Sequence, residues 1–145
     1  MLEANQVADY LLSLTDPEEG DIISHLQLQK LLYYAQGFYL AIYDQPLFIE
    51  EILAWEHGPV VKTVYDKFKG FRASALPVPE NIDFSVYSED EKNLINEVYT
   101  VYGQFSAWRL RQMTHDETPW NRTPRNQIIS HDIMKDYFKS QLVDA

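Results

Sequence analysis

The sequence predicts a mainly α-helical fold of about six helices packed around a central helix over residues 25–43, with at most a minor β-hairpin or short sheet. Two observations support this class: apolar residues recur at helical spacing in most segments, and hydrophobic residues make up 46% of the 145-residue chain. That content suffices to bury a core without disulfides or metals. Because no repeat or long linker interrupts the chain, we expect residues 1–145 to form a single domain.

Residues 25–43 carry the strongest helical signal. Ser24 followed by Gln27 matches a capping box, in which each side chain bonds the backbone N–H of the other. Apolar side chains occupy most of the circumference of the helix that follows. A helix of this kind is expected at the centre of a domain.

The other helices are expected to be amphipathic, with polar N-caps at Ser88, Ser106 and Ser130. Pro59 suits the first position of a helix that ends near Lys69, and Gly70 suits its C-terminal cap. The expected ranges are 5–14, 59–69, 88–102, 106–113 and a last helix from residue 131 onward.

Three segments are ambiguous or irregular in the sequence. Residues 49–55 are compatible with a short strand or an irregular segment, which periodicity does not decide. Residues 71–87 suggest a loop or small hairpin, and residues 115–124 are expected to be irregular because of Pro119 and Pro124.

The composition argues against several functional classes. The chain has no cysteine, which removes disulfides, thiolate nucleophiles and cysteine-ligated metals. It shows no signal peptide and no apolar stretch near the roughly 18 residues of a membrane span, so we expect a cytoplasmic protein without membrane partners. No phosphate-binding loop, nucleophile elbow or metalloprotease motif is present, and we expect no catalytic residues, bound metal or cofactor.

The charge distribution is compatible with a basic protein partner, or with acidic residues that serve only to keep a small domain soluble. The net charge is −10, and residues 1–51 contain nine acids against the single base Lys30. Nucleic acid is an improbable ligand for such a chain. The arginines between Arg109 and Arg125 form the one segment that could bind it, although pairing with neighbouring acids or a protein partner is the favoured interpretation.

Two segments are richer in polar and aromatic residues than packing requires. Residues 55–60 (Trp-Glu-His-Gly-Pro-Val) are compatible with a tight turn that holds His57 against a carbonyl, or with a ligand surface at a helix N-terminus. Residues 114–120 (Thr-His-Asp-Glu-Thr-Pro-Trp) suggest an ordered loop with Trp120 in the core. A metal-dependent hydrolase using His115, Asp116 and Glu117 is the alternative, but adjacent residues rarely aim at one ion.

Taken together, three segments resemble the Panacea (SocA-like antitoxin) domain family: residues 28–37 (Leu-Gln-Lys-Leu-Leu-Tyr-Tyr-Ala-Gln-Gly), 55–60 with Tyr65 following, and 114–120. The similarity extends from about Ala4 to Tyr137, which is nearly the whole chain. It implies a bacterial or phage-associated, non-enzymatic protein that neutralises a cognate toxin by direct contact. It also implies a possible role as an adaptor that delivers the toxin to a cellular protease.

The resemblance places the candidate partner-binding residues in these three segments. A phage-encoded protein associated with nucleic acid is a further alternative. The candidate residues are Lys30, Tyr34, Trp55, Glu56, His57, Gly58, Pro59, Val60, Tyr65, Thr114, His115, Glu117, Pro119 and Trp120.

Overall fold

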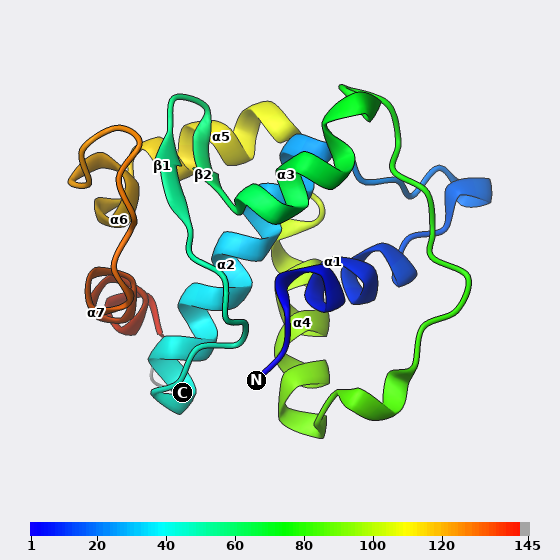
Figure 1. Cartoon of the computed structure of the whole chain (residues 1–145), viewed down its shortest axis with the longest axis horizontal. Coiled ribbons are helices and arrows are strands. Elements are labelled where there is room, and N and C mark those ends of the chain that lie inside the picture. The colour runs from blue at the N-terminus through cyan, green and yellow to red at the C-terminus, as the bar shows by residue number, and fades with distance from the viewer. Residues whose placement is uncertain (143–145) are drawn as a thin grey trace.

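A long helix crosses the middle of the molecule, and the other elements pack around it (Figure 1). The computed structural model describes residues 1–142. The α-helices are α1 (Ala4–Ser13), α2 (His25–Tyr43), α3 (Lys62–Phe68), α4 (Glu89–Tyr102), α5 (Ala107–His115), α6 (Thr118–Asn121) and α7 (His131–Gln141). The strands are β1 (Leu53–Trp55) and β2 (Gly58–Val60), and short 3-10 turns cover Pro17–Glu19, Lys69–Phe71 and Phe84–Val86.

The central helix is confirmed. α2 packs against α1, α3, α4, α5 and α7, and also against β2. Thirteen of its residues are buried, including the polar Gln29, Lys30 and Gln36. Its closest packing is with α7, where the Phe138 ring lies directly over Gly37, so that no side chain fits at that glycine.

The helix starts follow the predicted capping signals. Ser24 accepts a hydrogen bond from the backbone N–H of Gln27, whose side chain returns to the N–H of Ser24. Ser88 and Glu91 form the same reciprocal arrangement at α4. Ser106 and Ser130 cap α5 and α7 in the predicted way.

The expected helix over residues 59–69 is wrong at its start. Pro59 lies in β2, opposite Ala54, and α3 begins only at Lys62. The β1 backbone also bonds the chain around residues 126–129, with the Ala54 N–H donating to the Gln127 carbonyl at 2.9 Å. These pairings place residues 126–129, far along the chain, beside β1. Local sequence cannot reveal a contact of such long range. Pro59 is tolerated because β2 is the edge strand, whereas β1 has β2 on one side and residues 126–129 on the other.

The expected C-terminal cap at Gly70 is also corrected. Gly70 lies within a 3-10 turn, and Arg72 rather than the glycine has the positive φ, at 52° with ψ −121°. Of the loop or small hairpin expected over residues 71–87, the structure shows the loop, with the 3-10 turn Phe84–Val86 at its end, and the hairpin lies at 53–60. Residues 115–124 are more ordered than expected, because Pro119 occupies the first turn of the short helix α6.

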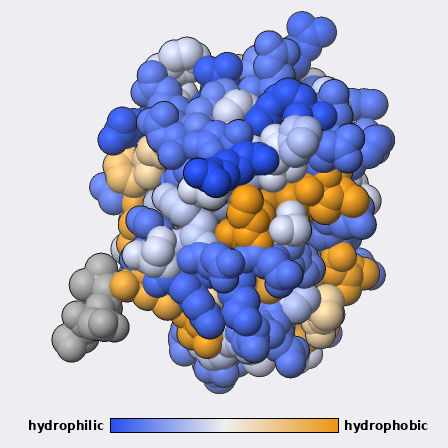
Figure 2. Space-filling view, turned by 90° about the vertical axis from the view of Figure 1, so that its left-hand side faces the viewer, coloured by the Kyte–Doolittle hydropathy of each residue, from blue (hydrophilic) through white to orange (hydrophobic). Residues whose placement is uncertain are grey.

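The surface is mostly polar. Figure 2 shows the side of the molecule at the left of Figure 1, where hydrophilic residues surround separate apolar patches. None of the helices within residues 1–142 combines the length and apolarity that crossing a bilayer requires.

Candidate partner-binding site

The β-hairpin presents the first motif at its turn. Trp55 pairs with Gly58 across the strands, which leaves Glu56 and His57 as the two turn residues. Gly58 has φ 117°, a conformation that favours glycine. Both Glu56 and His57 are exposed. The expectation of a tight turn that holds His57 against a carbonyl is therefore not met, since His57 makes no such hydrogen bond within the described residues.

Lys30 lies buried beneath this hairpin. Its Nζ donates a hydrogen bond of 3.3 Å to the Pro59 carbonyl, and a Cβ at Gly58 would lie 2.7 Å from the Lys30 Cε. Burial, followed by the nearby Arg111 guanidinium, lowers the pKa of Lys30 to about 7. The lysine therefore supports the hairpin from below and does not reach the surface.

Glu117 ties the third motif to α2. Its two carboxylate oxygens accept hydrogen bonds from the Tyr33 hydroxyl at 2.9 Å and the Tyr34 hydroxyl at 2.7 Å. Burial raises the pKa of Glu117 to about 7, although the two hydrogen bonds act in the opposite direction. Burial and the Glu117 carboxylate raise the pKa of both tyrosines, which stay protonated as donors.

Trp120 joins the third motif to the first. Its Nε1 donates a 2.7 Å hydrogen bond to the Trp55 carbonyl. The His115 ring stacks on the indole at 3.8 Å between centroids, and the Arg125 guanidinium lies 3.6 Å from the indole centroid. Burial, with nearby Arg111, Lys30 and Arg125, lowers the pKa of His115. Trp120 is half-buried in this stack, whereas the sequence analysis placed it in the core.

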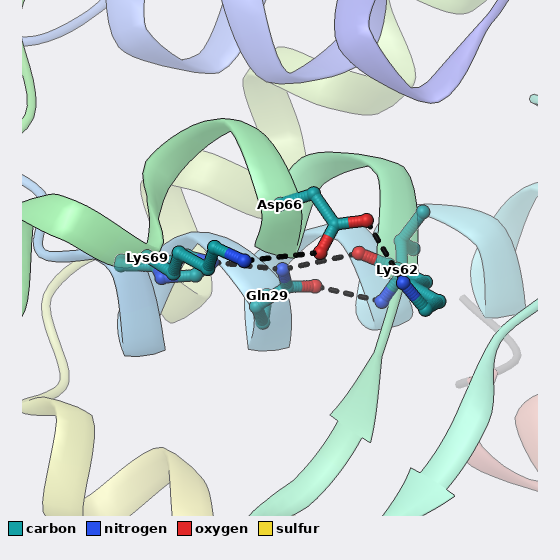
Figure 3. A network of polar contacts seen from close by, with 6 residues as sticks. Gln29, Lys62, Asp66 and Lys69 are labelled. Atoms are coloured by element: carbon teal, nitrogen blue, oxygen red, sulfur yellow. Dashed lines mark hydrogen bonds and ion pairs between the residues drawn. The ribbon is translucent and has the colours of Figure 1, made fainter.

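A polar bridge that sequence analysis missed holds the end of the hairpin. The Gln29 Oε1 accepts a 2.8 Å hydrogen bond from the Val61 N–H, and its Nε2 donates to the Val61 carbonyl at 3.3 Å (Figure 3). The same Nε2 lies 3.0 Å from the His25 Nε2. On the exposed side of α3, Asp66 pairs with Lys62 at 2.9 Å. The sequence feature that could have identified Gln29 is its position on a helix that is buried on nearly all sides.

The structure brings the predicted site residues together, but in three environments. Only Glu56 and His57 are exposed. Half-buried are Trp55, Tyr65, His115, Glu117 and Trp120. Buried are Lys30, Tyr34, Gly58, Pro59, Val60, Thr114 and Pro119.

The neighbouring segments also differ from expectation. Arg125 donates to the backbone carbonyls of Trp120 and Thr123, not to an acidic side chain. Trp108 is 61% exposed on α5, with the Arg111 guanidinium 5.2 Å from its ring, and sequence analysis did not identify it as a surface residue. Within residues 1–142 no group of three His, Cys, Asp or Glu side chains is arranged to hold a metal ion.

The fold and the site define a small, mainly helical protein in which three separated motifs assemble around one β-hairpin. Residues 28–121, more than half of the chain, match the family model of the antitoxin SocA-like, Panacea domain, and the protein belongs to that family. The chain is similar to the antitoxin SocA of Caulobacter vibrioides (strain NA1000 / CB15N), with 29% identity over 161 residues, covering 98% of this chain and 83% of the relative. No solved structure matches it significantly.

Proposed function

We propose that this protein is a single-domain antitoxin that neutralises a cognate toxin by direct contact, without turning it over. Membership of the SocA-like antitoxin family supports an antitoxin role. One structural observation supports the contact surface: the Trp120–Trp55 hydrogen bond places the exposed hairpin turn beside the third motif. The proposed surface, called the hairpin surface below, consists of Trp55, Glu56, His57, Trp108, His115 and Trp120.

The residue types of the hairpin surface suit protein recognition. Interface centres are enriched in tryptophan and other large side chains with a polar tip, and these often dominate the binding energy. Exposed Trp108 and half-buried Trp55 and Trp120 supply three such side chains. Three residues support the hairpin surface from the interior without contacting the partner: Lys30, Gly58 and Glu117. We assign them the role of positioning that surface.

We propose a basic toxin. The antitoxin carries a net charge of −10, and its first 51 residues contain nine acids. Opposite charge on the partner would increase the rate of encounter and favour correct pairing. We place the interaction in the cytoplasm. Delivery of the bound toxin to a cellular protease, which the family resemblance implies, would appear as a shorter toxin half-life when the antitoxin is present.

Co-purification tests the proposal. The tagged protein is purified from its host and the bound proteins are identified by mass spectrometry. We expect one small basic protein in stoichiometric amount, toxic when expressed alone, tolerated with the antitoxin, and unchanged in intact mass after the complex is dissociated. A bound protein that is harmless alone, or a toxin recovered with a changed mass, would contradict neutralisation by contact.

Variants then test the surface. Glu56→Lys with His57→Ala should leave folding intact and weaken neutralisation, because both side chains are exposed at the turn. The matched control is Glu80→Lys, an exposed acid in the connection between α3 and α4. Equal neutralisation by the double variant and the control would remove the hairpin turn from the interface.

A further inference from the structure

A small pocket lies between the hairpin, the start of α2 and α3. Its volume is about 200 Å³, and its lining includes His25, Leu26, Trp55, His57, Tyr65 and Arg72. No carboxylate lines it, although the chain contains 22 acidic residues. The surrounding sequence is also the one basic part of the N-terminal half: residues 52–75 contain four bases and two acids.

The Gln29 bridge fixes the orientation of the His25 ring. The Gln29 Oε1 accepts from the Val61 N–H, so its Nε2 is the donor that faces the His25 Nε2 at 3.0 Å. The His25 Nε2 must then accept, which assigns the ring proton to Nδ1. The described residues supply no hydrogen-bond partner for that Nδ1–H.

The remaining polar groups of the lining are donors as well. The Trp55 indole N–H, the Tyr65 hydroxyl and the Arg72 guanidinium make no side-chain hydrogen bond to another residue in the described part of the chain. An indole N–H and a guanidinium can only donate. The pocket therefore offers several donors. Its free side-chain acceptors are the Tyr65 oxygen and the His57 ring, because the Gln29 Oε1 and the His25 Nε2 are already engaged in the bridge to Val61.

The walls between these donors are apolar and aromatic. The Trp55 and Tyr65 rings pack edge to face with centroids 4.9 Å apart, and the His25 ring lies 5.4 Å from that of Tyr65. Leu26 and Val60 complete the lining. Arg72 is held at φ 52°, a conformation that is strained for a residue with a side chain and is common at ligand sites.

We propose that this pocket binds a carboxylate carried on an apolar or aromatic stem, as at the C-terminus or an acidic residue of a peptide. A lining with more free donors than free acceptors and no carboxylate suits an anion, the cationic Arg72 matches its charge, and the ring walls match the stem. The volume accommodates one side chain rather than an extended polymer. This site goes beyond the antitoxin proposal. It shares Trp55 and His57 with the hairpin surface, but it is argued from the pocket and its donors and does not depend on that proposal.

A pair of probes that differ only in the anionic group tests the site. N-acetyl-phenylalanine and its amide are titrated separately into the ¹⁵N-labelled full chain, and the Trp55 indole resonance is followed by NMR. We expect the acid to shift this resonance with a Kd on the order of 1 mM, and the amide to bind at least about ten-fold more weakly. Equal binding of acid and amide, or no shift with either, would overturn the proposal. Displacement of the acid by an equal concentration of inorganic phosphate would show a general anion site and overturn the role of the stem.

Two variants assign the donors. Arg72→Asn introduces a residue that tolerates a positive φ better than most and removes the charge, so the affinity for the acid should fall to that for the amide. Tyr65→Phe keeps the ring and removes one donor, and it should weaken the acid more than the amide. Arg122→Gln, at an exposed arginine outside the pocket, is the control and should bind as the parent does. Unchanged discrimination between acid and amide in both Arg72→Asn and Tyr65→Phe would contradict the assignment.

Discussion

The buried Lys30 and the half-buried Glu117 both lie close to the hairpin surface, and they do not pair with each other. Lys30 bonds a carbonyl, and Glu117 accepts from two tyrosines. Burial shifts the pKa of each toward the neutral form, so both have a pKa of about 7. Each pKa shift makes the stability of the fold depend on pH, in opposite directions.

The lysine should make the protein more stable as the pH rises above 7. Its pKa is about 7 when folded and 10.5 when exposed, so between these values the unfolded chain binds the additional proton. We expect the free energy of unfolding to rise by ~1 kcal/mol per pH unit in this window, and Lys30→Met to abolish the rise. Urea unfolding between about pH 7 and 9.5 measures it. Lys62→Met, at an exposed lysine, is the control; a rise that persists in Lys30→Met would contradict the burial account.

The glutamate should have the opposite effect at lower pH. Between 4.5 and about 7 the folded state holds the additional proton, so this contribution to stability is present below pH 4.5 and is lost as the pH rises to 7. Glu117→Gln should remove that loss while keeping hydrogen bonds to the tyrosines. Thermal unfolding across this range, with Glu80→Gln as the exposed control, measures the difference. The same decline in both variants would exclude Glu117 as its source.

At the level of single residues, the sequence supplied candidates for partner contact but not their positions in the fold. Lys30, Glu117 and Trp120 were all predicted as partner contacts, whereas Lys30 is buried and Glu117 faces two tyrosines. Their environments arise from contacts between residues about 30 to 85 positions apart, such as Lys30 with Pro59 and Tyr33 with Glu117. The donor-lined pocket was not predicted, because Arg72 has no motif of its own.

Among the elements, the packing of α2 against α7 determines the shape of the core. Phe138 is fully buried, and a Cβ at Gly37 would lie 2.1 Å from its ring. Gly37→Ala should destabilise the protein by ~1–3 kcal/mol, because overpacking outweighs the better helix propensity of alanine. Gly70→Ala is the matched control, since nothing lies within 4 Å of its added methyl group. Urea denaturation measures the stability of both variants. A Gly37→Ala protein as stable as the control would show that α2 and α7 can move apart at little cost.

Helix starts were predictable and the hairpin was not, for a physical reason. The capping boxes at Ser24 and Ser88 satisfy backbone N–H groups within four residues, so local sequence contains the whole signal. The hairpin depends on partners around residues 126–129, and this pairing overrides the helical preference of the segment after Pro59. The four-residue helix α6 is held by Glu117 and Trp120 contacts of the same long-range kind.

For the whole molecule, net charge should control how fast the partner is found. With a net charge of −10, the antitoxin should attract a basic toxin over a distance set by ionic strength. Raising NaCl from about 50 to about 500 mM should lower the association rate roughly ten-fold and change the dissociation rate much less. Surface plasmon resonance with the co-purified toxin measures both rates. An association rate that does not depend on salt would contradict a basic, electrostatically guided partner.

The central claim is that the toxin binds the hairpin surface, and hydrogen–deuterium exchange tests it most directly. Exchange is compared between the free protein and its complex with the co-purified toxin. We predict slower exchange on binding at backbone amides of residues 55–58 and 107–120, with no change in the connection between α3 and α4. A stable complex that protects other segments and leaves these two unchanged would contradict the account.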